Sequence, residues 1–423
     1  MECLDLAVEE WDDARFQRAE AVAFSVPMHT AMRLAVQAAT RLRAMRPLVP
    51  VAFYGLYAAI GADRTVGRLA DRLIVGEYEE ELAAWAGTPE RGSGGAVKID
   101  LGKTSFDRPA RHLLPGLDRY AHLEIEGEAR LAGYVEASHG CRHRCRHCPI
   151  PAVYDGRYRV TGLETVMSDV STLVGLGARH ITFGDPDFLN APRYAMDVLT
   201  EVNGAFPELT FDLTVKVEHV LEHQDLWAEV SRRNVAFVVS AFETTNDHVL
   251  HVLDKGHTAS DMAISTKVLR GAGIAVRPSW MPFTPLTGPN DLADIFEFMD
   301  DLELLATVDP VQLSIRLLIP EGSLILSSDM APFVEEYDSE ALTYRWRARD
   351  PKVDELQAKL AAVAEAGGDD HRATLLEMWS IVKPGSLSPA WPDVQPVRLS
   401  ESWFCCAEPT TTQLRQVTHL SKR

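Results

Sequence analysis

Three cysteines within eight residues are the part of this sequence best suited to chemistry. They stand in the run Cys141-Arg-His-Arg-Cys145-Arg-His-Cys148, which has the pattern C-x-x-x-C-x-x-C. Three thiolates this close in sequence can converge on one soft metal centre. A [4Fe–4S] cluster normally takes four protein thiolates, so a group of three leaves one iron open to a substrate or cofactor. The pattern predicts a cluster that takes part in chemistry, with Cys141, Cys145 and Cys148 as its ligands.

Two other uses of these cysteines must be weighed. One is a zinc site that adds His139, His143 or His147 as the fourth ligand. Structural zinc sites commonly pair a C-x-x-C motif with a distant second pair, and a dense trio without that pair fits poorly. The other is a cluster of disulfides, which requires an oxidising compartment. The first ten residues lack the basic head and apolar run of an export signal, so we expect reduced thiols and a cytoplasmic location.

The charge balance narrows the range of partners. The chain has 42 basic and 61 acidic residues, a net charge of -19. An acidic surface is not drawn to nucleic acid, and the arginines around the cysteines are expected to balance the negative charge of a cluster. No apolar stretch is long enough to cross a bilayer. These features favour a small-molecule substrate and make nucleic-acid and membrane partners unlikely.

The cysteine motif and its leader resemble a known family. C-x-x-x-C-x-x-C after a predicted strand is similar to the motif of radical S-adenosylmethionine (radical SAM) enzymes, and Glu136-Ala-Ser138-His-Gly140-Cys141 resembles the E-x-S-x-G-C opening of members that carry a cobalamin-type domain in front. The resemblance covers roughly residues 134–326. It implies that S-adenosylmethionine chelates the open iron. It also implies that an electron from a donor such as flavodoxin or ferredoxin cleaves a carbon–sulfur bond and starts radical chemistry on a substrate.

Strands and helices alternate from residue 131 onward and predict where the motif sits. Helices are expected between the strands, for example over 163–175 and 261–271. Six such repeats predict a partial (β/α)6 TIM-like barrel, in which functional groups gather at the carboxyl ends of the strands. The cysteine motif follows the first strand. The expected strands cover residues 131–137, 180–183, 210–217, 235–242, 274–280 and 311–318.

The same geometry nominates residues that hold the cofactor. Gly184 and Asp185 follow the second strand, where the resemblance implies a stretch that holds the cofactor's amino group. Ser240 and Glu243 end the fourth strand, where the resemblance implies contacts with its ribose. Lys216 ends the third strand; it meets the cofactor carboxylate or the substrate, or is a solvated strand end. A helix over 246–256 is expected to be mainly structural.

Residues 1–95 are expected to form a small Rossmann-like domain. Apolar runs over 49–55 and 70–77 predict buried parallel strands, and Phe53-Tyr-Gly55 and Gly76-Glu77 resemble signatures of a cobalamin-binding domain. The D-x-H-x-x-G segment whose histidine ligates cobalt is absent, and His29 is the only histidine before residue 112. Cobalamin is therefore left open but not favoured. A flexible stretch over 91–96 and a connector over 96–130 are expected to lead to the barrel at 131–328.

The region 329–423 is expected to form a C-terminal extension with helices over 352–367 and 370–382. It ends in the string Cys405-Cys406-Ala-Glu-Pro409. Neighbouring thiols can chelate a soft ion or form an easily reduced disulfide, although free cysteines are often simple core residues. The string resembles the tail of a small group of radical SAM proteins in which selenocysteine sometimes replaces the second cysteine. That resemblance implies a reactive thiol at Cys406.

Three functions remain open from the sequence. The first is a radical SAM enzyme whose Cys405 and Cys406 capture a thiophilic substrate, such as an arsenical or selenium compound, or donate a proton, electron or covalent handle. The second is a cobalamin-dependent, methyltransferase-like relative. The third is a non-catalytic zinc or iron–sulfur scaffold, which requires the barrel pattern to be a coincidence.

Overall fold

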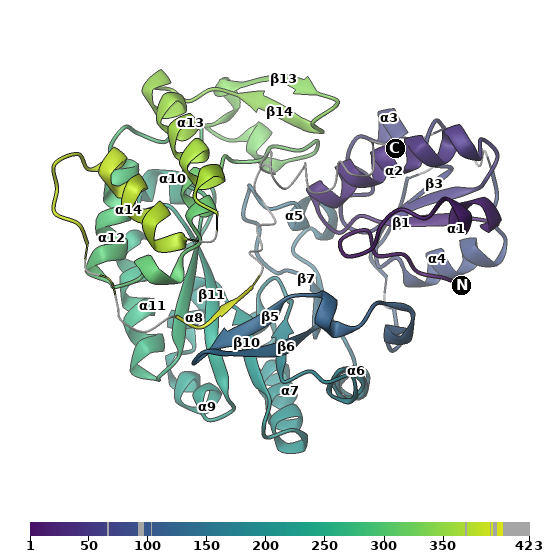
Figure 1. Cartoon of the computed structure of the whole chain (residues 1–423), viewed down its shortest axis with the longest axis horizontal. Coiled ribbons are helices and arrows are strands. Elements are labelled where there is room, and N and C mark those ends of the chain that lie inside the picture. Colours follow the sequence, from purple (N-terminus) through teal and green to yellow (C-terminus); the bar gives the residue numbers. More distant parts are fainter. Residues whose placement is uncertain are drawn as a thin grey trace.

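The computed structural model describes residues 1–65, 67–91, 97–102, 104–368, 370–389, 391 and 396–400. It has an N-terminal α/β domain beside a larger α/β barrel (Figure 1). A hairpin formed by β13 (Val334–Asp338) and β14 (Thr343–Trp346) lies between them. Both lobes contain parallel sheets, as the strand–helix alternation predicts. No helix in these ranges is long and apolar enough to cross a membrane.

The N-terminal domain is a four-stranded parallel sheet in the order β1-β2-β3-β4. Its fourth strand lies beyond the boundary expected near residue 95. The apolar face of α2 packs on the sheet around Phe53 and Leu73, which are fully buried. The elements are α1 (Asp13–Arg18), β1 (Val22–Ser25), α2 (His29–Met45), β2 (Val51–Tyr54), α3 (Ala62–Thr65), β3 (Arg72–Gly76), α4 (Glu79–Gly87) and β4 (Val97–Asp100).

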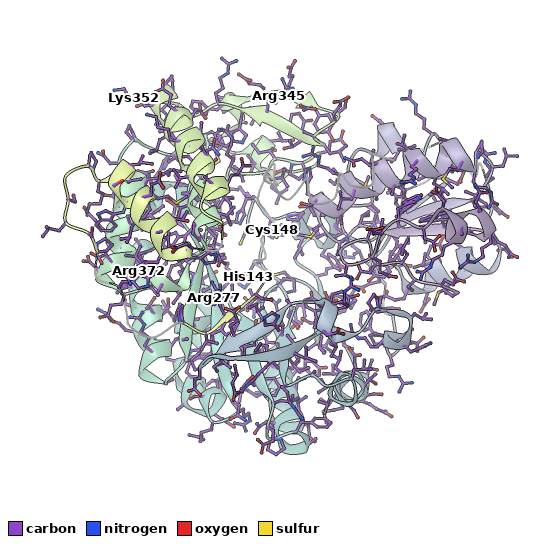
Figure 2. The ribbon with its side chains drawn as sticks, in the orientation of Figure 1. His143, Cys148, Arg277, Arg345, Lys352 and Arg372 are labelled. Carbon is purple, nitrogen blue, oxygen red and sulfur yellow. The ribbon has the colours of Figure 1, made fainter. Side chains whose placement is uncertain are left out.

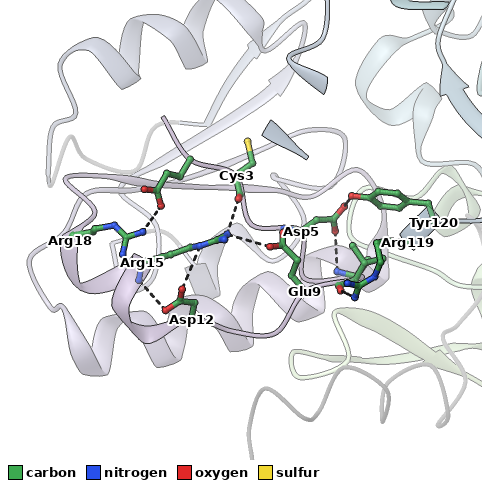
Figure 3. Close-up of polar contacts among 11 residues, drawn as sticks. Cys3, Asp5, Glu9, Asp12, Arg15, Arg18, Arg119 and Tyr120 are labelled. Carbon is green, nitrogen blue, oxygen red and sulfur yellow. Dashed lines mark hydrogen bonds and ion pairs between the residues drawn. The ribbon is translucent and has the colours of Figure 1, made fainter. Parts of the chain in front are cut away.

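The first residues fasten this domain to the connector that follows it. Tyr120 donates a hydrogen bond from its hydroxyl to Asp5 Oδ2 at 2.8 Å, and Arg119 donates to the Val8 carbonyl at 2.6 Å. Figure 3 shows these contacts beside Arg15, which donates to the Cys3 carbonyl. The connector is therefore held against the start of the chain before it enters the barrel.

The barrel is built on a curled seven-stranded sheet in the order β12-β11-β10-β9-β6-β5-β15. The first five strands in this order run parallel. Strand β5, which lies within the expected connector, joins β6 through an antiparallel hairpin. The strands are β5 (His122–Ile125), β6 (Glu128–Val135), β9 (His180–Phe183), β10 (Thr210–Thr214), β11 (Val235–Glu243) and β12 (Ala275–Trp280), with β15 (Arg398–Leu399) at the far edge.

The helices of the barrel pack on the outside of this sheet. Their apolar faces and the strands share one core with the C-terminal helices, so the barrel and its extension form one packed body. The helices are α6 (Leu163–Gly175), α7 (Pro192–Ala205), α8 (Val217–Glu222), α9 (Trp227–Ser231), α10 (Asp247–Val252), α11 (Ala259–Gly271), α12 (Asp291–Asp301), α13 (Pro351–Ala366) and α14 (His371–Val382). The short helix α5 (Ile150–Tyr154) instead packs toward the N-terminal domain, whose core Val153 contacts.

The predicted sixth strand was wrong. Residues Pro310–Ser314 form a 3-10 helix, η6. Within the described ranges, this segment pairs with the loop after β12 only through a single β-bridge between Phe283 and Arg316. Pro310 has no amide hydrogen to donate to a ladder, which favours the helical turn at this point. A buried strand and a buried 3-10 helix both show a continuous apolar run, and for this reason the sequence predicted a strand here.

The C-terminal extension begins with a two-stranded hairpin. It consists of β13 (Val334–Asp338) and β14 (Thr343–Trp346). Leu342, in its turn, is buried in the N-terminal core beside α2, and Trp346 is buried in the barrel core. The hairpin therefore joins the two lobes.

Candidate active site at the carboxyl edge of the barrel sheet

The cysteine motif lies in the loop that follows β6, at the carboxyl edge of the parallel sheet. A short hairpin of β7 (Ser138–Gly140) and β8 (Tyr158–Val160) leads into this loop, residues 141–148, which we call the cysteine loop. Gly140 has φ +75, and a Cβ there would meet the Arg157 carbonyl at 2.4 Å, so only glycine lets the hairpin close ahead of Cys141. Figure 2 places His143 and Cys148 near the centre of the view, between the two lobes.

All three cysteines are free thiols in the described part of the chain. Cys141 and Cys145 are buried, and Cys148 is half-buried. Burial raises the pKa of the Cys141 thiol to about 12 and also raises that of Cys145. Thiols ligate metals as thiolates, so buried, soft donors of this kind are suited to a positively charged iron centre that offsets the cost of their ionisation. The donor set fits an iron–sulfur cluster.

The side-chain amide of Asn190 and two backbone carbonyls hold the cysteine loop in place. Asn190, in the 3-10 helix η3 (Phe188–Asn190) after β9, accepts hydrogen bonds at Oδ1 from the Arg142 amide at 3.2 Å and from Cys141 Sγ at 3.7 Å. Arg146 donates from its amide to the Leu253 carbonyl at 2.9 Å and from its guanidinium to the Val252 carbonyl at 2.7 Å. The loop is thus fixed to the end of β9 and to α10.

Asp185 fastens the start of the loop rather than facing an open site. Its Oδ2 accepts from the Ala137 amide at 2.9 Å and its Oδ1 accepts from the Ser138 hydroxyl at 2.5 Å. Burial raises the pKa of Asp185 to about 7, although both hydrogen bonds favour the ionised form. The neighbouring Gly184 lies under Tyr134, because a Cβ at Gly184 would stand 2.0 Å from the tyrosine ring. Both predicted residues therefore have roles in packing the strand end.

Ser240 and Lys216 come from adjacent strands. The Ser240 hydroxyl donates to the Val215 carbonyl at 2.7 Å and is buried, so it links β11 to the end of β10. Lys216 begins α8 and donates to Glu218 Oε2 at 2.5 Å. Lys216 is only 9% exposed, which rules out the solvated strand end that the sequence left open.

Glu243 is the predicted residue that lies closest to the cysteine loop. Its Oε1 accepts from Lys255 Nζ at 2.9 Å and stands 3.2 Å from His147 Nε2. Burial alone would raise the pKa of this carboxyl, but Lys255 and His147 hold it below its usual range. Glu243 has φ +65 and follows a β-bulge with β12, a backbone conformation that non-glycine residues rarely adopt and that gathers at functional sites.

The structure adds residues that the sequence argument missed. Lys255 belongs to the stretch expected to be mainly structural, yet its ammonium group, 3% exposed, neutralises Glu243. His147 was considered only as a zinc ligand, and the structure turns it toward Glu243. The signal available was the interleaving of histidines with cysteines, because side chains in such a loop reach the neighbouring strand ends.

A second histidine link joins the loop to the N-terminal domain. His139 Nδ1 lies 3.3 Å from Glu77 Oε2, and its Nε2 lies 3.1 Å from Glu136 Oε2. Burial lowers the pKa of His139, but the two carboxylates more than offset this and raise it to about 10. Glu77 follows β3 and is buried, so a charged pair crosses between the two lobes just ahead of Cys141.

The carboxyl edge of the N-terminal sheet is where a cobalamin would be expected. This chain fills that edge with its own residues: His29 Nε2 lies 3.2 Å from the Leu342 carbonyl, and the Leu342 side chain is buried there. A Cβ at Gly55 would meet the Val26 carbonyl at 3.2 Å, and one at Gly76 the Asp100 carbonyl at 2.1 Å. The two glycines thus serve close backbone packing at this edge.

Cys405 and Cys406 lie outside the described residues. The last described segment before them is β15, which pairs antiparallel with β5 and brings Ser400 beside His122. Since β5 is also antiparallel to β6, β15 runs parallel to β6.

Comparisons with known proteins agree with this geometry. Residues 135–302 match the family model described as the radical SAM superfamily. No curated protein matches the chain. OxsB, a cobalamin-dependent S-adenosylmethionine radical enzyme solved with aqua-cobalamin, shares 14% identity at a TM-score of 0.62 over 81% of this chain and 58% of its own.

A second solved structure has the same type of fold. TsrM from Kitasatospora setae, a radical S-adenosylmethionine methyltransferase with cobalamin and a [4Fe–4S] cluster bound, shares 15% identity at a TM-score of 0.51 over 69% of this chain and 62% of its own. This chain therefore spans about three fifths of the length of either protein. At these identities the likeness is one of fold. The partial barrel of this chain is a domain of the radical SAM superfamily, which implies a [4Fe–4S] cluster and S-adenosylmethionine as cofactors.

Proposed function

We propose that this chain is a radical SAM enzyme in which Cys141, Cys145 and Cys148 ligate the cluster and residues 131–328 form the catalytic unit. The supporting observation is the position of the cysteine loop, buried at the carboxyl edge of the parallel sheet and anchored by side chains from the ends of β9 and β11. When bound, a reduced [4Fe–4S] cluster would supply one electron to the sulfonium of S-adenosylmethionine, which would break a carbon–sulfur bond and leave a carbon-centred radical. The chain positions these groups and excludes water from them.

The charges around Cys145 support a division of roles among the predicted residues. Lys216 and Lys255 both act to lower its pKa, while Glu243 raises it, so the three charges lie near this thiol. We assign Lys216 to the cofactor carboxylate and Glu243 to its ribose hydroxyls. Gly184, Asp185 and Ser240 act as positioning residues, because their contacts are used within the strand ends.

Cluster ligation is tested by changing each loop cysteine to Ala. The wild-type chain, reconstituted anaerobically, should carry about four irons, and each variant should lose the cluster absorbance. Cys3→Ala is a matched control, since Cys3 is a free thiol in the N-terminal segment. A Cys145→Ala protein that kept four irons would refute the assignment. One zinc without iron in the wild type would support the scaffold instead.

We further propose that Cys405 and Cys406 act on the substrate, as reactive thiols or as ligands of a thiophilic compound. The register of β15 supports this: Ser400 stands beside His122, which pairs with Leu131 four residues before the end of β6. Measured along the strand direction, Ser400 therefore lies about 13 Å from the carboxyl end of β6, where the cysteine loop follows. The electron would come from a donor such as flavodoxin or ferredoxin in the reducing cytoplasm expected from the cysteine content.

Cobalamin-dependent chemistry is a second candidate, favoured by the solved structures of similar fold. OxsB and TsrM were both solved with cobalamin. Because His29 and Leu342 fill the corresponding edge here, we derive no step through cobalamin. Hydroxocobalamin mixed with the cluster-loaded chain should separate from it on desalting. Retention of one corrin per chain would favour this candidate.

A further inference from the structure

Two histidines and one carboxylate meet beside the cysteine loop. His143 comes from that loop, Asp187 follows β9, and His219 lies on α8. Each offers a ligand atom within 4.8 Å of those of the other two. Asp187 Oδ2 lies 3.2 Å from His143 Nε2 and 2.7 Å from His219 Nδ1. These three residues are called the His–Asp–His set.

The three atoms that face one another lack hydrogen bonds. His143 Nε2, Asp187 Oδ2 and His219 Nδ1 are all buried and have no partner of acceptable geometry within the described ranges. Asp187 Oδ2 is within ion-pair distance of both imidazole nitrogens, but neither contact has the geometry of a hydrogen bond. Buried polar atoms are rarely left unsatisfied, and such a group calls for a ligand or ion. Lone pairs that converge on one point are the arrangement a cation requires.

Groups outside the His–Asp–His set orient the other side-chain atoms of Asp187 and His143. Asp187 Oδ1 accepts from the Leu189 amide at 3.1 Å, which leaves Oδ2 directed at the histidines. His143 Nδ1 lies 3.7 Å from Glu218 Oε2. A carboxylate behind an imidazole, on the nitrogen away from the ion, is the usual outer support of a metal-binding histidine. Glu218 is in turn held by Lys216 at 2.5 Å.

We propose that the His–Asp–His set binds one divalent transition-metal ion, Zn²⁺ or Fe²⁺. Two imidazoles and one carboxylate are the ligands of many catalytic zinc sites and of non-haem iron sites, and three protein ligands leave at least one position open. Zinc–ligand bonds of about 2.0–2.2 Å in a tetrahedral site place neighbouring ligand atoms about 3.3–3.6 Å apart. The separation of 3.2 Å between Asp187 and His143 is close to this value, and the separation of 2.7 Å between Asp187 and His219 must widen by several tenths of an ångström when an ion binds. The ion pins the cysteine loop to β9 and α8, and it is separate from the cluster.

The test measures metal content and Co²⁺ binding in the full, cluster-loaded chain after a wash with chelator. The wild type should hold one zinc, or a fifth iron, beyond the four cluster irons. Exchange with Co²⁺ should give the d–d absorption of a nitrogen- and oxygen-ligated ion. Asp187→Asn and His219→Ala should weaken Co²⁺ binding more than about 10-fold, because even loss of an outer partner costs 10–100-fold. Retention of four irons shows that the variants are folded.

His251→Ala is the matched control, since His251 is an exposed histidine on α10 and should leave Co²⁺ binding unchanged. A cluster-loaded wild type that binds neither zinc, extra iron nor Co²⁺ overturns the proposal, whatever the variants do. Equal Co²⁺ binding by His219→Ala and wild type also overturns it. Because the readout is a fifth metal, failure of this site is distinguishable from failure of the cluster assignment.

Discussion

His147 of the cysteine loop places its Nε2 atom 3.2 Å from Oε1 of Glu243, at the bulged end of β11. The same oxygen accepts from Lys255 at 2.9 Å. One carboxylate thus joins the loop that carries the cysteines to the strand end that is expected to face the cofactor ribose. Its rare backbone conformation is held in place because both sides of the contact are buried.

Replacing Glu243 by Gln should destabilise the barrel strongly. Lys255 is 3% exposed, so removal of the Glu243 charge takes away a large part of the compensation of a buried ammonium group. Breaking a buried pair in this way typically costs about 3–5 kcal/mol. Thermal unfolding should therefore occur at lower temperature, and Lys255→Met in the same chain should restore part of the loss.

An exposed pair provides the control for this experiment. Arg347 and Glu335 lie 2.8 Å apart, but the arginine side chain is 79% exposed. Arg347→Gln should shift the free energy of unfolding by less than about 1 kcal/mol. If Glu243→Gln cost no more than Arg347→Gln, the buried pair would not be holding the strand end.

Asp185 should make stability fall as pH rises from about 4 to about 7. Burial raises its pKa to about 7 in the folded chain, against 3.8 for the ordinary carboxyl. Between pH 4 and 7 the Asp185 carboxyl is protonated in the folded chain and ionised in the unfolded chain. The stability that this protonation contributes is therefore complete below pH 4 and is lost as pH rises through 7. Asp185→Asn keeps an acceptor and a donor for Ala137 and Ser138 and should remove this slope.

The measurement is the difference in unfolding free energy between wild type and Asp185→Asn at several pH values. The difference isolates one carboxyl from the many others that titrate in acid. A difference that stayed constant from pH 4.5 to 7.5 would show that Asp185 keeps an ordinary pKa in the folded chain.

Much of the barrel was predictable because its signals are local. The strand at 180–183 and the helix at 163–175 have the bounds expected from apolar runs and helical periodicity. The position of the cysteine motif followed from the alternation alone, because carboxyl ends of parallel strands share one edge. The sixth strand was predicted wrongly because a buried 3-10 turn with a single bridge has the same apolar pattern as a strand.

The partners of the site residues were not predictable, because they depend on pairs distant in sequence. Asp185 was predicted to hold the cofactor, and that role stays a prediction; the hydrogen bonds of its carboxylate to residues 47 and 48 positions earlier could not be read from the sequence. The convergence of His143 with Asp187 and His219 likewise required the register of β9 beside β10. Cys405 and Cys406 remain a prediction from sequence, since they lie outside the described residues.

The vicinal thiols should bind trivalent arsenic in the cluster-loaded chain. Two soft thiolates next to each other chelate such an ion more tightly than a single thiol does. Arsenite added to the wild type should give one bound arsenic per chain after desalting. Cys406→Ser should abolish this, whereas Cys3→Ser should not. Equal arsenic retention and unchanged substrate turnover in Cys406→Ser would remove any role for the pair.

Consumption of S-adenosylmethionine by the reduced, cluster-loaded chain tests the central claim most directly. Anaerobic wild type with dithionite should cleave a carbon–sulfur bond of the sulfonium, and chromatography of the products shows which bond is broken. Cleavage should require the reductant and should be absent in Cys145→Ala. Wild type that holds four irons, is reduced and still leaves S-adenosylmethionine intact would contradict the assignment of this chain as a radical SAM enzyme.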